Sequence, residues 1–209
     1  MLGPGSGHGR VSKYFDLSKV ETGVFWNMAE CPIPEGMDIT TLVGNITKSL
    51  KAEGFNGRIT VYAYDHISHE ERSYNDANVI ASRLHSGDAD ANLRLTISSF
   101  LCWALRRPAP ANIMVIVKDI TVHSGIIRAF DRVTRKRYNC MVAQQVESRE
   151  PFDDSIDKAW LWDHLAFGKP ALSPPLTSSS TSHSQGDKSM QTQFMELKLK
   201  EISSDEADG

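Results

Sequence analysis

The sequence contains little cysteine and no long apolar run. Its 209 residues include three cysteines, Cys31, Cys102 and Cys140, and none of them forms a C-x-x-C pair. A disulfide framework and a zinc ribbon are therefore excluded, and a reducing compartment fits best. No stretch approaches the roughly 18 apolar residues of a membrane span, and the first residues lack the apolar core of a secretory signal. These absences predict a cytoplasmic protein without a membrane span.

Positive charge is also scarce. Lys and Arg total 23 against 26 Asp and Glu, which gives a net charge of −3. No segment reads as a basic tail, so contact with nucleic acid would require a local patch. The 40% apolar and 23% charged shares are those of a globular protein.

The two ends of the chain differ from its middle. Residues 1–21 begin with a glycine-rich run and are expected to be a flexible segment. Residues 169–209 are predicted to be a disordered tail, because nine of the residues in 171–190 are Ser or Thr and cannot bury enough apolar surface. Residues 191–202 regain some apolar character, which leaves two interpretations open: a solvated tail, or a short motif that docks a protein partner. The folded domain is expected over 22–168.

Within that domain, short β-rich runs alternate with helical patterns. Strands are predicted at 22–28, 58–64, 112–119 and 138–144, and helices at 38–53, 74–84, 90–106, 122–134 and 155–167. Such alternation predicts an α/β fold of three layers, with a mainly parallel central sheet and helices on both faces. The four tryptophans are expected to pack in the core.

Ligands of such folds bind at the carboxyl ends of the strands, which places Asn27, Asp65 and Asp119 along one edge. A metal nuclease would need several carboxylates there, because Mg²⁺ requires oxygen ligands that balance its charge. Asp119, Asp90 and Glu30 are the candidates. Each has an ordinary alternative: Asp119 bonding local amides, Asp90 capping a helix, and Glu30 lying in a solvated loop.

Five segments of the chain carry a family resemblance: VFWNMAECPIPEG, RITVYAYD, LCWALRRPAPANIMVIVKD, YNCMVAQ and AWLWDHL. Together they resemble a plant NYN domain, the PIN-like nuclease fold of the limkain and meiosis-regulator (mRNA stability factor) type, over residues 22–166. The resemblance implies a Rossmann-like domain, a metal-dependent ribonuclease activity using Mg²⁺ or Mn²⁺, and a role in regulating gene expression. It also implies association with peroxisomes, although no targeting signal is present.

The chain departs from this family at the acids that hold the metal. The usual W-D-I-E-N-C after the first strand is here W-N-M-A-E-C, so Asn27 replaces the leading acid. In the same register Leu93 and Ser99 replace the two acids of the middle helix, and Thr121 replaces the second acid after the central strand. Only Asp119 is retained, and Lys118 beside it would repel a cation. The resemblance therefore implies a degenerate catalytic site that needs no cofactor, with Asp119 the metal ligand if any metal binds.

A basic cluster follows the central strand. Arg128, Arg132 and Arg135 recur at helical spacing, and Lys136 and Arg137 extend the run. The cluster is a candidate RNA-binding site through phosphate contacts, with Arg94, Arg106 and Arg107 able to widen it if the faces align. The alternative is a solvated helix end, where cations are favoured by the helix dipole.

Two histidine motifs are set aside as ordinary surface or loop residues. His66 and His69 have no Cys or Glu partner at metal-site spacing, and His123-Ser124 lacks a nucleophile elbow.

Three functional hypotheses remain. The first is a degenerate NYN domain that binds RNA or a protein partner. The second is an active ribonuclease whose rearranged acids are Asp119, Asp90, Glu30 and Asp65. The third is a protein-interaction module without an RNA role. None implies DNA as a partner.

Overall fold

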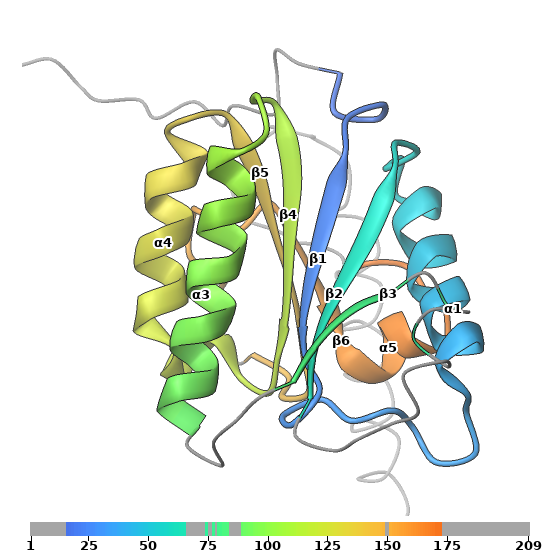
Figure 1. The fold of residues 1–209 in the computed structure, drawn as a ribbon. Helices are drawn as coiled ribbons and strands as arrows, with labels where there is room; N and C mark the ends of the chain where they lie inside the picture. The colour runs from blue at the N-terminus through green and yellow to red at the C-terminus, as the bar shows by residue number, and fades with distance from the viewer. Residues whose placement is uncertain are drawn as a thin grey trace, which may run out of the picture. The chain divides into compact units, whose positions relative to one another are not determined.

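Six parallel strands form the centre of the domain in the computed structural model (Figure 1). The structure describes residues 16–65, 74, 77, 79–83, 89–148 and 151–172. The sheet order is β3-β2-β1-β4-β5-β6. The strands are β1 (Thr22–Asn27), β2 (Ile59–Asp65), β3 (Val79–Arg83), β4 (Ala111–Val117), β5 (Tyr138–Gln144) and β6 (Lys158–Leu161). The predicted α/β fold with a parallel central sheet is confirmed.

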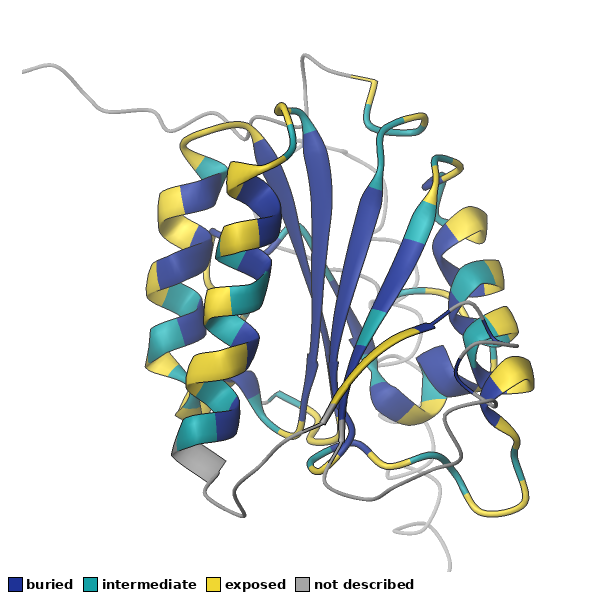
Figure 2. Ribbon diagram, in the orientation of Figure 1, coloured by how far each residue is buried: buried dark blue, intermediate teal, exposed yellow. Residues whose placement is uncertain are grey.

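Helices cover both faces of this sheet. On one face lie α1 (Ile39–Ala52) and α5 (Trp162–Ala166), and on the other α3 (Ala89–Leu105) and α4 (Ser124–Thr134). A short 3-10 helix, η2 (Ile120–Val122), joins β4 to α4. The inward sides of the helices are buried and their outward sides exposed, as Figure 2 shows. No described helix is long and apolar enough to cross a membrane.

The central strands are buried from end to end, which explains their mainly apolar sequence. Every residue of β1, β4 and β5 is buried, as expected where a parallel sheet is covered on both faces. Alternate side chains of one strand enter different cores, so that Trp26 packs toward α1 and α5 while Phe25 packs toward α3.

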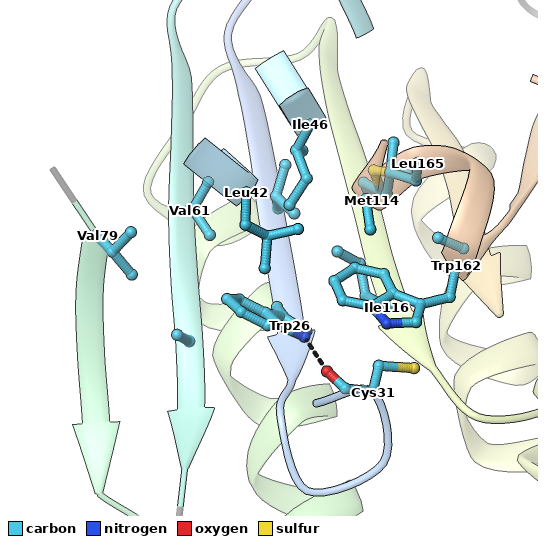
Figure 3. Packing of buried hydrophobic residues seen from close by; sticks show 14 of the residues in the cluster. Trp26, Cys31, Leu42, Ile46, Val61, Val79, Met114, Ile116, Trp162 and Leu165 are labelled. Carbon is cyan, nitrogen blue, oxygen red and sulfur yellow. Dashed lines mark hydrogen bonds between the residues drawn. The ribbon is translucent and has the colours of Figure 1, made fainter. Parts of the chain in front are cut away.

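Tryptophans anchor the loop that follows β1. Trp26 lies 5.5 Å from Trp162 between ring centroids, and its Nε1 donates to the carbonyl of Cys31 at 2.7 Å (Figure 3). Trp162 Nε1 in turn donates to the carbonyl of Pro32 at 3.2 Å. The expected core positions of Trp26, Trp103, Trp160 and Trp162 are confirmed, because each is at most 5% exposed. The loop at residues 28–32 is thereby fixed against the α1 face.

Two predicted helices are wrong in part. Within 74–84, residues Val79–Arg83 form the edge strand β3, paired with β2 from Val61↔Val79 onward. Within 155–167, Lys158–Leu161 form β6, and only Trp162–Ala166 are helical. Both errors have one physical cause, which is the shortness of the strands. In a strand of four or five residues the alternation of apolar and polar side chains is too brief to be distinguished from the helical spacing of the apolar residues around it.

The described residues just outside the predicted domain limits are hydrogen bonded to the domain. Asn56 N donates to Ser18 O at 2.7 Å, and Asn112 N donates to Glu21 O at 2.9 Å, although 1–21 was expected to be flexible. Beyond residue 168, Leu172 N donates to Ala159 O at 2.8 Å and Ala171 N to Glu53 Oε1 at 3.0 Å.

Candidate functional site at the carboxyl edge of the sheet

The carboxyl ends of β1 and β4 mark the most informative place in the fold. The chain proceeds outward from β1 to β2 and β3, returns to β4 beside β1, and then proceeds outward to β5 and β6. The connections after β1 and β4 therefore diverge at this point, and ligands of open α/β sheets bind in the crevice that results. As the sequence predicts, Asn27 ends β1, Asp65 ends β2, and Asp119 follows the end of β4.

Asn27 is a buried amide with an unsatisfied oxygen. The residue is 2% exposed, and its Oδ1 is buried without a hydrogen-bond partner among the described residues. It lies two residues after Phe25, hence on the α3 side of the sheet. Burying this side-chain amide oxygen without a hydrogen bond lowers the stability of the fold.

Asp119 uses its carboxylate within its own turn. One oxygen, Oδ1, accepts from the amide of Thr121 at 2.9 Å and from the hydroxyl of Thr121 at 2.7 Å. These bonds to Thr121 hold the pKa of Asp119 below its ordinary value. Asp119 thus caps η2, the local role that the sequence offers as the alternative to metal binding.

Glu30 connects three segments at the edge. Its Oε2 accepts from the backbone amide of Lys118 at 2.8 Å and lies 3.2 Å from Nε2 of His123. Burial alone would raise the pKa of Glu30, but the hydrogen bonds from His123 and Lys118 outweigh it and leave this pKa below its ordinary value. The carboxylate therefore ties the loop after β1 to the end of β4 and the start of α4.

No sequence pattern predicts the pairing of Glu30 with His123. On sequence alone His123-Ser124 is an ordinary pair, and 93 residues separate Glu30 from His123 in the chain. Only the return of β4 to the side of β1 brings them together.

The side of α3 toward the sheet carries neutral polar groups. Asn92 and Thr96 are buried, and Thr96 Oγ1 donates to the carbonyl of Asn92 at 3.0 Å. Ser99 shares a side-chain hydrogen bond with Tyr64, whose burial raises its pKa to about 12. Tyr64 is the β2 partner of Asn27. Leu93 is partly buried and packs against the apolar core of this face.

The described residues do not fit a divalent cation. Among them, no group of three or more His, Cys, Asp or Glu side chains lies close enough together to hold a metal ion. Asp119 is engaged by Thr121, and Glu30 by Lys118 and His123. The Lys118 side chain is exposed, so its repulsion of a cation is screened by solvent and weaker than the sequence suggests. The structure describes Asp65 and Asp90 only as backbone positions at the ends of β2 and α3, and His66 and His69 lie outside the described residues.

The basic cluster lies away from this edge. α4 begins beside the carboxyl edge after η2 and runs back toward the start of β5, about 16 Å along its axis. Arg128 and Arg132 are exposed on α4, Arg135 caps its end, and Lys136 and Arg137 follow in the turn. Arg135 also pairs with Asp131 at 2.8 Å. The structure therefore separates the candidate RNA-binding residues from the candidate catalytic positions.

Comparison with known protein families gives one match. The family model described as NYN domain matches residues 21–160, which include β1 and its loop, α3, β4, α4 and most of β6. No curated protein matches the chain.

Proposed function

Since this chain belongs to the NYN domain family, whose members resemble RNA nucleases, we propose that it binds RNA without metal-dependent cleavage. The proposal follows from the chemistry of the carboxyl edge. A divalent cation requires several convergent carboxylates, and this edge presents an amide at Asn27 and hydroxyls at Thr96 and Ser99.

The hydrogen bonds at the edge carry the proposal. Glu30 could serve as a metal ligand only by releasing the Lys118 amide and His123, both of which stabilise its ionised form. Asp119 would likewise have to release the two donors of Thr121. Both carboxylates therefore act as hydrogen-bond acceptors with a structural role: Glu30 connects the loop after β1 to the end of β4, and Asp119 holds the turn after β4.

The finer assignment within the family is part of the same proposal. The chain is a degenerate domain of the limkain and meiosis-regulator type that contributes to the regulation of gene expression. It acts in the cytoplasm, in association with peroxisomes, and needs neither Mg²⁺ nor Mn²⁺. Residues 169–209 supply a contact for a protein partner.

RNA binding in the absence of divalent metal tests this proposal. We expect the full chain to bind a fluorescein-labelled single-stranded RNA in EDTA, and millimolar Mg²⁺ or Mn²⁺ not to strengthen that binding, as measured by fluorescence anisotropy. The RNA should remain intact on a denaturing gel. Binding should not require metal because the contacts go to phosphates through protein cations, for which divalent ions only compete.

Two results would contradict the proposal in different ways. Mn²⁺-dependent cleavage that disappears in Asp119→Asn would establish an active enzyme with a rearranged acid set. An RNA that fails to bind even at low salt would favour a protein-interaction module.

A further inference from the structure

The helices α3 and α4 and the turns that follow them carry an excess of basic residues. Residues 91–110 and 124–137, which include most of α3, all of α4 and their following turns, contain eight basic residues and one acidic residue, Asp131. Residues 28–53 and 162–172, which include α1 and α5, contain five acidic and three basic residues. The segment before β6, which carries Asp153, Asp154 and Asp157, packs on the α3/α4 side of the sheet through Phe152 and Ile156. A chain of net charge −3 therefore presents a local basic patch on one face, as nucleic-acid binding requires.

The basic residues of this patch face solvent on two helices that pack against each other. α3 and α4 lie side by side on one face of the sheet, with their exposed sides outward (Figures 1 and 2). We call their outward side the α3/α4 surface. Its exposed basic residues are Arg94, Arg106, Arg128, Arg132, Arg135, Lys136 and Arg137.

One hydrogen-bonding side chain holds the ends of the two helices together. The Tyr138 hydroxyl, at the start of β5, lies 2.6 Å from the carbonyl of Ala104 and 2.7 Å from that of Arg107. Because Tyr138 directly follows the turn after α4, this contact fixes Lys136 and its neighbours relative to the end of α3. The patch is therefore organised before a ligand arrives, which lowers the entropic cost of binding.

Three of these cations have no ion-pair partner among the described residues. Arg128, Arg132 and Lys136 form no ion pair within the part of the chain that the structure describes. Arg107, in contrast, is paired with Glu21 at 2.8 Å and lies 4.9 Å over the ring of Trp103. Lone cations remain fully available to an anionic ligand, whereas Arg107 has a structural role.

The chemistry of the surface suits phosphate rather than bases. Arg128 and Arg132 are four residues apart on α4, which is a rise of about 6 Å along the helix axis. This rise is comparable with the spacing of successive phosphates along a nucleic-acid strand. The aromatic side chains of α3 and α4, Phe100, Trp103 and Phe130, are buried. Base stacking therefore has no exposed platform on these two helices.

From these observations we infer that the α3/α4 surface binds the phosphate backbone of RNA without selecting its bases, an inference that rests on the proposed RNA-binding function. Arg128, Arg132 and Lys136 form the centre of the contact. The carboxyl edge of the sheet takes no part in it, because the patch extends toward the opposite end of α4.

Charge neutralisation in the full chain tests this surface. The test variant combines Arg128→Gln, Arg132→Gln and Lys136→Gln. The control combines Lys48→Gln, Lys51→Gln and Lys169→Gln, three exposed lysines of the other layer, so that both variants change the net charge equally. The probes are labelled oligo-U and oligo-A RNA, with thermal unfolding as a check that each variant is folded.

We expect the test variant to bind oligo-U at least about tenfold more weakly at low salt, and its plot of log Kd against log salt to flatten by about 2, as loss of three phosphate contacts requires. The control should bind like the unchanged chain, and both probes should bind alike.

Equal RNA binding by the test and control variants would overturn this inference and leave the proposed function standing. A tenfold preference for one of the two probes would overturn base-independent binding. Poly-glutamate binding as tight as that of RNA would show a general site for acidic chains. Failure of the unchanged chain to bind RNA would instead remove the proposed function itself.

Discussion

Asn27→Asp is expected to lower the free energy of unfolding by about 3 kcal/mol at pH 7, because it buries a carboxylate that has no partner. Asn27 is 2% exposed, and its oxygen already lacks a donor among the residues that the structure describes. Burial raises the folded-state pKa of such a carboxyl group above its unfolded value of about 3.9. The loss of unfolding free energy is therefore complete above the raised folded-state pKa. It disappears below about pH 4, where the new carboxyl group is protonated in both the folded and the unfolded state.

Denaturant unfolding of the purified chain at several pH values measures this effect. Asn27→Leu is the matched control, since leucine has the same branched skeleton as asparagine and aspartate without a charge, and its stability should depend on pH as that of the unchanged chain does. Rescue of Asn27→Asp by millimolar Mg²⁺ would contradict the account, because it would mean that other acids converge on this position.

Gly57→Ala is expected to lower the free energy of unfolding by about 3 kcal/mol through a backbone clash. A Cβ atom at Gly57 would lie 2.0 Å from the carbonyl oxygen of Val20 and 2.6 Å from its carbon. The colliding atoms are main chain, so no side-chain rotation relieves the contact, and the segment leading into β1 must move. That segment is held by Asn56 N donating to Ser18 O and by Thr22 N donating to Arg58 O.

Gly44→Ala is expected to have the opposite effect on the stability of the same domain. Gly44 lies within α1, and a Cβ there would meet nothing within 4 Å. The change should stabilise the domain by roughly 0.5–1 kcal/mol, since alanine is the better helix former. Thermal unfolding of the two variants gives the comparison. Equal stability of Gly57→Ala and the unchanged chain would mean that residues 16–21 do not pack on the domain as described.

The central strands could be predicted from sequence because their burial is complete. β4 is buried at every residue and is apolar except at Asn112, a pattern typical of a strand covered on both faces. The edge strands β3 and β6 could not be predicted. Ile80 in β3 is 50% exposed, so that strand shows little apolar pattern. In β6, the run through Trp160 and Trp162 continues into α5 without a break in apolar character.

The candidate site was predictable in position but not in its contacts. Strand ends alone place Asn27 and Asp119 at one edge, because the carboxyl ends of parallel strands meet there. What each carboxylate bonds depends on the turn that follows it. Asp119 reaches Thr121 because the chain turns into η2, and Glu30 reaches His123 because η2 delivers that ring beside the loop after β1. The sequence offers local bonds as the alternative role of Asp119, whereas no pattern in it indicates the contact of Glu30 with His123.

The α3/α4 surface was also predictable in part from the sequence. The spacing of Arg128 and Arg132 predicts that they share a helix face, and both are exposed on α4. Their relation to α3 required the packing of the two helices and the Tyr138 contacts. The basic character of the α3/α4 surface is likewise a property of the fold, since the chain as a whole is slightly acidic.

The response of thermal stability to divalent metal tests the central claim most directly, namely that this NYN domain has no functional metal site at its carboxyl edge. The measurement compares the melting temperature of the full chain in EDTA with that in millimolar Mg²⁺ or Mn²⁺. A ligand present at a hundred times its dissociation constant adds about 2.7 kcal/mol to the stability of the state that binds it. The account predicts the same melting temperature in all three solutions. A rise of several degrees that Asp119→Asn abolishes would contradict it.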